Sequence, residues 1–302
     1  MNLASLDLNL TVALRALLEE RNVTRAGHRV GLSQPAMSAA LARLRHHFDD
    51  ELLFRTGNRY ELTPLGTALL TRTATACDLL ERLFTTQADF DPAVEEREFT
   101  LLSVDYGVAT FGTELARLLH KEAPGIRLRF LQPPPDILEN TATILSTVDG
   151  LLMPHGIISG FPTVELYEDR WVCVVSEDHP EVSDRLTLED LARFPWAIYQ
   201  RPYDTPVNRQ LSMLGIDPHI EVSTQSFQLL PALVAGTRRI AMIQERLAQQ
   251  LLDAYAVRIL PCPFDAVPVA EALWWHPLHT QDAAHIWLRE TAMKLGAQMA
   301  RR

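Results

Sequence analysis

Polar and cationic side chains between residues 33 and 59 have the chemistry needed to contact nucleic acid. Gln34 and Ser38 are four residues apart, so one face of a helix would carry both, and their amide and hydroxyl groups can hydrogen-bond to base edges. Guanidinium groups such as that of Arg43 are suited to phosphate oxygens. We expect the contacts to come from Ser33, Gln34, Pro35, Ser38, Arg43, Arg55 and Arg59.

Three short helices and a hairpin are needed to position these side chains. Ser33 stands at the N-cap position of the third helix, and Pro35 lies in its first turn, where a missing N–H costs nothing. Segments 52–54 and 60–62 flank Gly57-Asn58, which predicts a hairpin wing. The pattern predicts a winged helix-turn-helix, and the alternative is a three-helix structural subdomain with a polar outer face. The predicted buried faces are Leu10, Leu14, Leu17 and Leu18, then Val23, Ala26 and Val30, then Met37, Leu41 and Leu44.

Charge does not decide between a winged helix-turn-helix and a three-helix structural subdomain. Residues 1–63 carry eight arginines and seven acidic residues, but Arg43, Arg45 and Arg55 belong to the outward face of the third helix and to the wing, so a local basic face is compatible with a neutral domain. The whole chain has a net charge of −10, and residues 1–90 are balanced, so the negative charge lies in residues 91–302. A neutral head on an acidic body favours nucleic-acid contact through the head alone.

Two runs of sequence make a more specific indication. GLSQPAMSAALARLR, followed by FDDELLFRTGNRYELTPLG, resembles the DNA-binding domain of LysR-type transcriptional regulators. LDLNLTVALRALLEERNVT, QSFQLLPALVAGTRRIAMI and WWHPLHTQDAAHIWLRE are similar to the nodulation-regulator branch of that family, so the resemblance covers essentially the whole chain. Position 39 in the third helix is often long and polar or basic in the family. Here it is Ala39, so direct base reading rests on fewer side chains.

The resemblance implies both a fold and a function. The fold is α/β overall, with an N-terminal winged helix-turn-helix, a long linker helix and a C-terminal two-lobed effector domain resembling periplasmic binding proteins. The function is sequence-specific, DNA-binding transcriptional regulation controlled by a small-molecule effector. The implied partners are double-stranded operator DNA, the effector and further copies of the chain, as a homodimer or as a tetramer on DNA, with RNA polymerase as a further candidate.

A long helix is expected from residue 64 to about residue 87. A helix of about 24 residues is about 36 Å long, which is too long to be covered by a small winged head. The helix is either an ordinary packed helix or an exposed linker that pairs with its copy, and the resemblance favours the linker. We expect domains 1–63, 64–90 and 91–302, with lobe I at about 97–163 and 270–302 and lobe II at about 169–265. The predicted pairing stripe is Leu65, Leu69, Ala76, Leu80 and Leu83.

From residue 99 onward, strands alternate with helices, which predicts parallel sheets with crossover connections in two lobes. Ligands of such sheets lie beyond the carboxyl ends of the strands and against helix N-termini, as at Ser226. Each candidate taken singly is better explained as a cap or a turn, and the prediction of a site rests on the converging set. The set contains no lysine, so a flat, largely apolar ligand, such as the aromatic inducers that the resemblance implies, fits better than a polyanion. The expected effector contacts are Ser103, Asp105, Tyr106, Gln132, Met153, His155, Tyr203, Gln225, Ser226 and Phe227.

No catalytic, cofactor or metal site is predicted. The chain lacks the GxSxG, GxxxxGK[ST], GxGxxG and HExxH motifs. His276, His279 and His285 fall on different predicted elements, which argues against a metal site. The three cysteines form no CxxC pair, and no signal peptide or membrane span is visible, so we expect a reducing cytoplasm and no membrane partner. Two rival functions remain: a DNA-binding or architectural protein without a ligand, and an enzyme, which would need a convergent titratable site.

Overall fold

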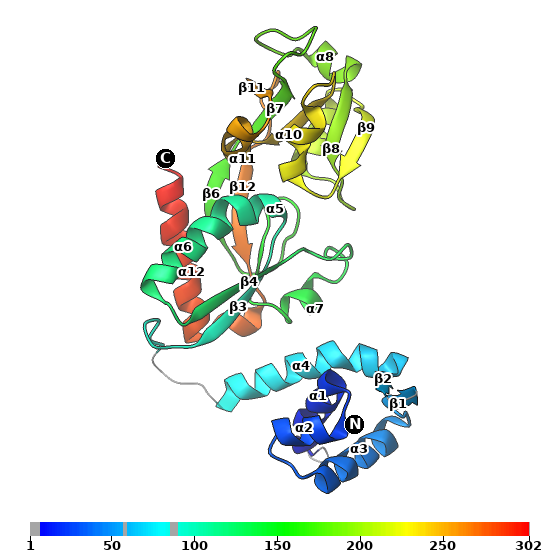
Figure 1. Cartoon of the computed structure of the whole chain (residues 1–302). Helices are drawn as coiled ribbons and strands as arrows, with labels where there is room; N and C mark the ends of the chain where they lie inside the picture. Colours follow the sequence, from blue (N-terminus) through cyan, green and yellow to red (C-terminus); the bar gives the residue numbers. More distant parts are fainter. Residues whose placement is uncertain (1–6, 57–58, 85–89, 302) are drawn as a thin grey trace. The chain divides into compact units, whose positions relative to one another are not determined.

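The computed structural model describes residues 7–56, 59–84 and 90–301. The chain forms two compact units, Met1–Gln87 and Ala88–Arg302, each with its own hydrophobic core (Figure 1). Among the described residues, no helix is both long enough and apolar enough to cross a bilayer. The finer division of the chain at residues 63 and 90 stays a prediction.

The first unit is a three-helix head with a wing and a long helix. The fully buried side chains of Leu17, Leu18 and Met37 form its core, as the helical spacing predicted. The wing is an antiparallel hairpin in which Leu53 faces Leu62 in register, while the predicted turn Gly57-Asn58 lies outside the described residues. The predicted winged helix-turn-helix is therefore confirmed. Its elements are α1 (Asn9–Glu20), α2 (Val23–Arg29), α3 (Gln34–Phe48), β1 (Leu53–Thr56), β2 (Arg59–Leu62) and α4 (Pro64–Phe84).

Arg45 fastens the wing to α3. Its Nε donates to the carbonyl of Glu51 at 2.9 Å, and its Nη2 donates to the carbonyl of Leu53 at 2.8 Å. Asp50 Oδ1 accepts from the backbone N–H of Leu52 and from the hydroxyl of Thr63, at 2.6 and 2.7 Å. The sequence pattern left Arg45 on the outward face with Arg43, but its side chain turns back because these carbonyls need donors.

Helix α4 packs along α1. Leu65 and Leu69 pack against the core of the head, and the buried Cys77 places Sγ 3.7 Å from the carbonyl of Thr11. The expectation that the stripe has no partner inside the head is therefore wrong for its first half, since α1 runs far enough along α4 to cover that half. Leu80 is half-buried, and the side chain of Leu83 lies outside the described part of the chain.

The second unit contains two five-stranded sheets, one in each lobe (Figure 1). The sheet of lobe I has the order β4-β3-β5-β12-β6, and the sheet of lobe II has the order β11-β7-β10-β8-β9. Lobe I consists of β3 (Arg97–Leu102), β4 (Ile126–Leu131), β5 (Gly150–Leu152), β6 (Thr163–Asp169) and β12 (Val269–Trp274). Lobe II consists of β7 (Trp171–Ser176), β8 (Pro195–Tyr199), β9 (His219–Thr224), β10 (Ile240–Gln244) and β11 (Val257–Pro261).

Helices cover both faces of each sheet. In lobe I, Leu101 belongs to the core shared with η2, α6 and α12, while its neighbour Leu102 belongs to a second core next to α7. In lobe II, α10 and α11 lie on one face and α8 and α9 on the other. These helices are α5 (Asp105–Gly107), η2 (Val108–Gly112), α6 (Thr113–Glu122), α7 (Thr141–Leu145), α8 (Leu188–Arg193), α9 (Pro206–Met213), η3 (Phe227–Leu229), α10 (Leu230–Val234), α11 (Glu245–Leu251), η4 (Leu252–Ala254), η5 (Pro277–His279) and α12 (Ala283–Met299).

The sheets are mixed, which corrects the expectation of parallel sheets. The β3–β4, β3–β5, β8–β9 and β8–β10 pairs are parallel, but β7 and β12 pair antiparallel with their neighbours. The antiparallel strands are those next to the two crossings between the lobes, where the chain enters a sheet from its other end. Strand β6 was not predicted from the sequence.

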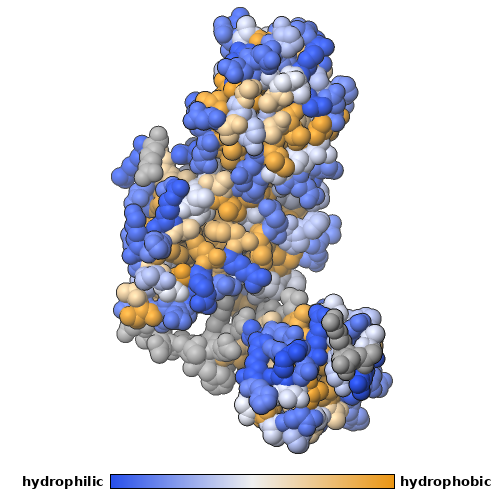
Figure 2. Space-filling view, in the orientation of Figure 1, coloured by the Kyte–Doolittle hydropathy of each residue, from blue (hydrophilic) through white to orange (hydrophobic). Residues whose placement is uncertain are grey.

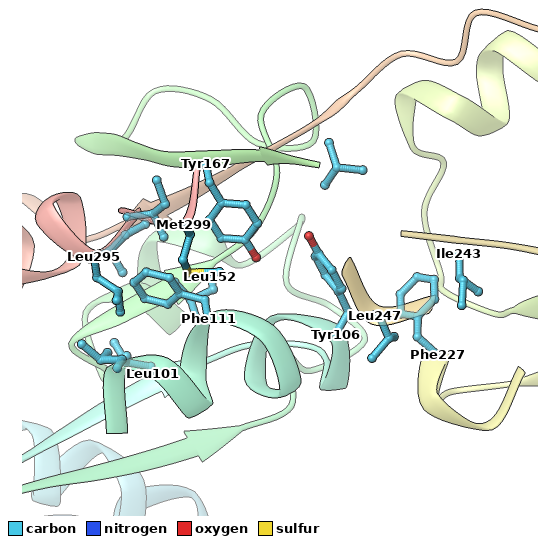
Figure 3. Close-up of a cluster of buried hydrophobic side chains, with 14 of the residues drawn as sticks. Leu101, Tyr106, Phe111, Leu152, Tyr167, Phe227, Ile243, Leu247, Leu295 and Met299 are labelled. Atoms are coloured by element: carbon cyan, nitrogen blue, oxygen red, sulfur yellow. The ribbon is translucent and has the colours of Figure 1, made fainter. Parts of the chain in front are cut away.

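One hydrophobic core runs through the junction of the two lobes. It includes Phe111 and Leu152 of lobe I together with Phe227, Ile243 and Leu247 of lobe II (Figure 3). On the face of the molecule shown in Figure 2, hydrophobic patches are scattered among hydrophilic residues. The lobes are therefore joined by packed side chains as well as by the two chain crossings.

Candidate functional site

The first turn of α3 presents the predicted base-reading residues. Ser33 caps the helix by accepting from the N–H of Ala36 at 3.4 Å, and Ser33, Gln34 and Pro35 are all exposed. Gln34 Nε2 donates to Ser38 Oγ at 3.1 Å, so the two side chains lie on one face and hold each other in position. A helix N-terminus with exposed amide and hydroxyl groups can bind phosphate with its backbone and base edges with its side chains.

The three arginines that were predicted to bind phosphate differ in their surroundings. Arg43 is exposed and forms an ion pair with Asp7 at 3.0 Å, a surface pair of the kind that contributes little and exchanges readily. Arg55 is exposed on β1 of the wing. The side chain of Arg59 lies outside the described residues.

In the second unit, Asp105 of lobe I binds a backbone turn of lobe II. Its carboxylate accepts from the hydroxyl of Ser226 at 2.6 Å, from the N–H of Phe227 at 3.1 Å and from the N–H of Gln228 at 3.0 Å. Asp105 begins α5, and Ser226 is the N-cap of η3. These are the donors that the sequence analysis reserved for the polar end of an effector, so in this structure a side chain of the protein itself occupies that place.

Three of the predicted contacts are buried. Tyr106, Met153 and Phe227 are 1%, 2% and 2% exposed. Phe227 stacks on Tyr199 with ring centroids 4.0 Å apart, and Tyr106 meets its edge at 6.4 Å. A ligand can touch these three side chains only if the lobes part.

A second group of predicted residues gathers around Trp274. The ring of His155 lies edge-on to Trp274 at 5.0 Å, and the indole N–H of Trp274 donates to the carbonyl of Met153 at 2.7 Å. Tyr203 of lobe II packs against the same cluster of lobe I. His155 and Tyr203 are half-buried, so they remain open to a ligand at the lobe boundary.

The remaining predicted residues lie apart from these groups. Ser103 is buried, and its hydroxyl donates to the carbonyl of Val104 at 3.0 Å. A Cβ on Gly107 would come within 2.3 Å of that hydroxyl, so the hydroxyl is packed under α5. Gln132 and Gln225 are exposed.

A buried polar cluster lies behind Tyr106. The hydroxyl of Tyr106 donates to Asp169 at 2.9 Å, and the hydroxyl ends of Tyr106 and Tyr167 point toward each other (Figure 3). Glu271 of β12 is 2% exposed, and its Oε2 finds no hydrogen-bond partner among the described residues. Burial, together with the charge of Asp169, raises the pKa of Glu271 to about 8, so this carboxyl is protonated at neutral pH. The signal for it in the sequence is one acid inside the apolar strand VAEALW.

Arg201 is a further residue that the sequence analysis missed. Its guanidinium lies over the rings of Tyr199 and Phe227, with centroid distances of 4.9 and 5.4 Å. Burial lowers the pKa of Arg201 from its usual value. The available signal was position, since Arg201 follows the end of β8 just as Asp105 follows the end of β3.

Other clusters and hollows of the described chain offer less. No group of three His, Cys, Asp or Glu side chains that could hold a metal occurs among the described residues. The rings of His279 and His285 do stack at 5.1 Å, and burial lowers the pKa of His285 to about 4. A hollow of about 610 Å³ near the lobe junction contains none of the predicted effector contacts, and its charged lining includes Glu114, Glu168, Asp169, Arg170, Glu245 and Arg246.

Comparison with known proteins identifies the family. The model "Bacterial regulatory helix-turn-helix protein, lysR family" matches residues 8–75, and "LysR substrate binding domain" matches residues 93–296. Over 302 residues the chain is 33% identical to "Nodulation protein D 2" of Rhizobium tropici, covering 99% of this chain and 96% of that protein. Over 304 residues it is 33% identical to "Nodulation protein D 3" of Rhizobium meliloti (strain 1021), covering 99% and 96%.

Solved structures agree with this result. The crystal structure of "probable transcriptional regulator PA0477 from Pseudomonas aeruginosa" is 28% identical, with a TM-score of 0.75 over 97% of this chain and 98% of that chain. Full-length CbnR in complex with its target DNA shares the fold, with a TM-score of 0.55 and 16% identity over 96% of this chain and 100% of that chain. The family matches cover most of both units, so this chain belongs to the LysR family of DNA-binding transcriptional regulators, which are not enzymes.

Proposed function

We propose that this regulator is controlled by a small aromatic or largely apolar effector that binds where the two lobes meet. The observation that carries the proposal is the contact between Asp105 of lobe I and residues 226–228 of lobe II, bordered by half-buried Tyr199 and Tyr203. A ligand at such a contact changes the relative stability of two lobe arrangements, which is the requirement for ligand control.

The roles of the predicted contacts follow from their exposure. Half-buried Asp105, His155, Tyr203 and Ser226 are assigned to direct effector contact. Buried Tyr106, Met153 and Phe227 are assigned to the wall behind the ligand, while Ser103, Gln132 and Gln225 are peripheral. The resemblance to nodulation regulators implies aromatic inducers, which favours an aromatic ligand. The aromatic side chains at the lobe boundary would pack against such a ligand.

The wider assignment follows the family. We propose a DNA-binding domain at 1–63, a pairing helix at 64–90 and an effector domain at 91–302. The partners would be operator DNA, further copies of the chain (as a homodimer, or as a tetramer on DNA) and RNA polymerase. The compartment would be the cytoplasm.

Replacing Gln34 by Ala should relax sequence preference at one base position by about 1–3 kcal/mol, because the amide would no longer pair with a base edge. Replacing Arg55 by Ala should weaken binding to every sequence alike and reduce the salt slope by about 1, because a phosphate contact releases counterions. Selection of bound sequences, combined with salt titration, measures both effects. Arg29→Ala on α2, which is paired with Glu19, is the control. An unchanged ranking of sites for Gln34→Ala would refute the assignment.

The second half of α4 is proposed to pair with its copy. Leu80 is only half-buried, and Leu8 and Val12, near the stretch of α1 that touches Cys77, are 47% and 46% exposed. Leu80→Glu would bury a charge in the seam and should weaken self-association in sedimentation velocity, whereas Thr67→Glu on the exposed face should not. Equal sedimentation of Leu80→Glu and the wild type would contradict the pairing. Leu69→Glu is unsuitable, since Leu69 packs against the head's core.

Tyr203→Ala should abolish the response to an aromatic effector while leaving basal operator binding intact, because Tyr203 joins lobe II to the His155 cluster without entering the core. Footprinting of an operator with and without a panel of simple aromatic compounds measures both properties, with Tyr255→Ala in the same lobe as the control. Phe227→Ala is a poorer probe, because truncating a buried Phe costs about 3–5 kcal/mol. A Tyr203→Ala protein that responds at the wild-type concentration would move the site elsewhere, and no response to any compound would favour the ligand-independent reading.

A further inference from the structure

Arg201 lacks the partners that a partly buried arginine normally has. Its Nε is buried without a hydrogen-bond partner, and no described residue forms an ion pair or a hydrogen bond with any nitrogen of this guanidinium. Its favourable contacts are instead with the rings of Tyr199 and Phe227. Desolvating a cation without pairing it is unfavourable, so the position calls for an anion.

Other partly buried arginines of the second unit are paired. Arg97 binds Asp149 and Asp282 at 3.3 and 2.9 Å. Arg239 bonds to Glu221 and donates to the carbonyl of Leu233 at 3.1 Å. Arg258 also has a buried Nε without a partner, but its Nη atoms donate to the carbonyls of Ser183 and Val182. Among the partly buried arginines that the structure describes in this unit, Arg201 is therefore the one whose guanidinium has no such partner.

The nearby acid does not serve Arg201. Asp105 directs its carboxylate to the donors at 226–228 across the lobe contact. Burial, together with the charge of Glu271, raises the pKa of Tyr203, which stands two residues beyond Arg201. Glu271 itself is enclosed in the core of lobe I. An anion for Arg201 would therefore come from outside the second unit.

The surroundings of the Arg201 guanidinium favour a carboxylate as the bound anion. A guanidinium stacked on aromatic rings keeps its N–H donors in its own plane, where a planar carboxylate can accept two of them. One unpaired cation balances one negative charge, which disfavours sugar phosphates and other polyanions. We propose that Arg201 binds the carboxylate of an aromatic carboxylic acid, whose ring packs beside Tyr199 and Tyr203. This inference rests on the proposed effector site and names its ligand class.

The test compares two ligands of matched size and shape, one a carboxylate and the other its neutral amide. The full-length protein is titrated with cinnamate and with cinnamamide, in the wild type, Arg201→Gln, Arg201→Lys and the control Arg185→Gln, which removes an exposed arginine of the same lobe. Calorimetry reports affinity, operator footprinting reports the response, and thermal unfolding checks that each variant folds.

The wild type and Arg185→Gln should bind the acid at least about tenfold more tightly than the amide, as expected for a charge-assisted hydrogen bond. Arg201→Gln should lose this preference while keeping its affinity for the amide, and Arg201→Lys should keep part of the preference. Equal binding of acid and amide by the wild type, or an unchanged preference in Arg201→Gln, would overturn the role of Arg201 while leaving an effector site that takes neutral aromatics. Binding of neither compound, without any change in the footprint, would overturn the inference together with the effector site for this class.

Discussion

The bond between the Asp105 carboxylate and the turn at residues 226–228 is the interaction on which the effector domain depends. Asp105 begins α5 and is separated from the end of β3 by two residues, and Ser226 directly precedes η3, so two strand-to-helix turns from different lobes face each other. A carboxylate that accepts one hydroxyl and two backbone N–H groups forms charge-assisted bonds, which are stronger than neutral ones. The same contact sets the position of Phe227 against Tyr106, and so connects the Asp105 hydrogen bonds to the core.

This arrangement provides a physical route for ligand control. At the lobe boundary, the Asp105 contact lies next to the stacked rings of Tyr199 and Phe227 and to the unpaired Arg201. A ligand that supplies a negative charge to Arg201 would approach the carboxylate of Asp105. Its charge would then change the strength of the bonds between Asp105 and residues 226–228. Binding would then be coupled to the separation of the lobes, because one lobe contributes the cation and the other contributes the acid.

The sequence predicted the features that depend on local periodicity. The helical stripe around Met37 and the cap at Ser33 are both observed where the sequence predicted them. It did not predict β6 or the antiparallel pairs of β7 and β12, because strand direction depends on where the chain re-enters a sheet after crossing between lobes. The partner of Asp105 is about 120 residues away, and a single Arg or Glu carries no periodic signal. Arg201 and Glu271 are therefore visible only once the lobes are assembled.

A double-mutant cycle between Asp105 and Ser226 tests the central role of the lobe contact most directly. The free energy of unfolding of the effector domain in the full-length chain is measured for the wild type, Asp105→Ala, Ser226→Ala and the double variant. A direct bond predicts a coupling energy of about 1–3 kcal/mol. The parallel cycle with Ser223→Ala, a serine that bonds to Gln200 instead, should be additive. Additive effects for Asp105 and Ser226 would contradict the account, because the bond from the Ser226 hydroxyl to the Asp105 carboxylate would then contribute nothing to stability.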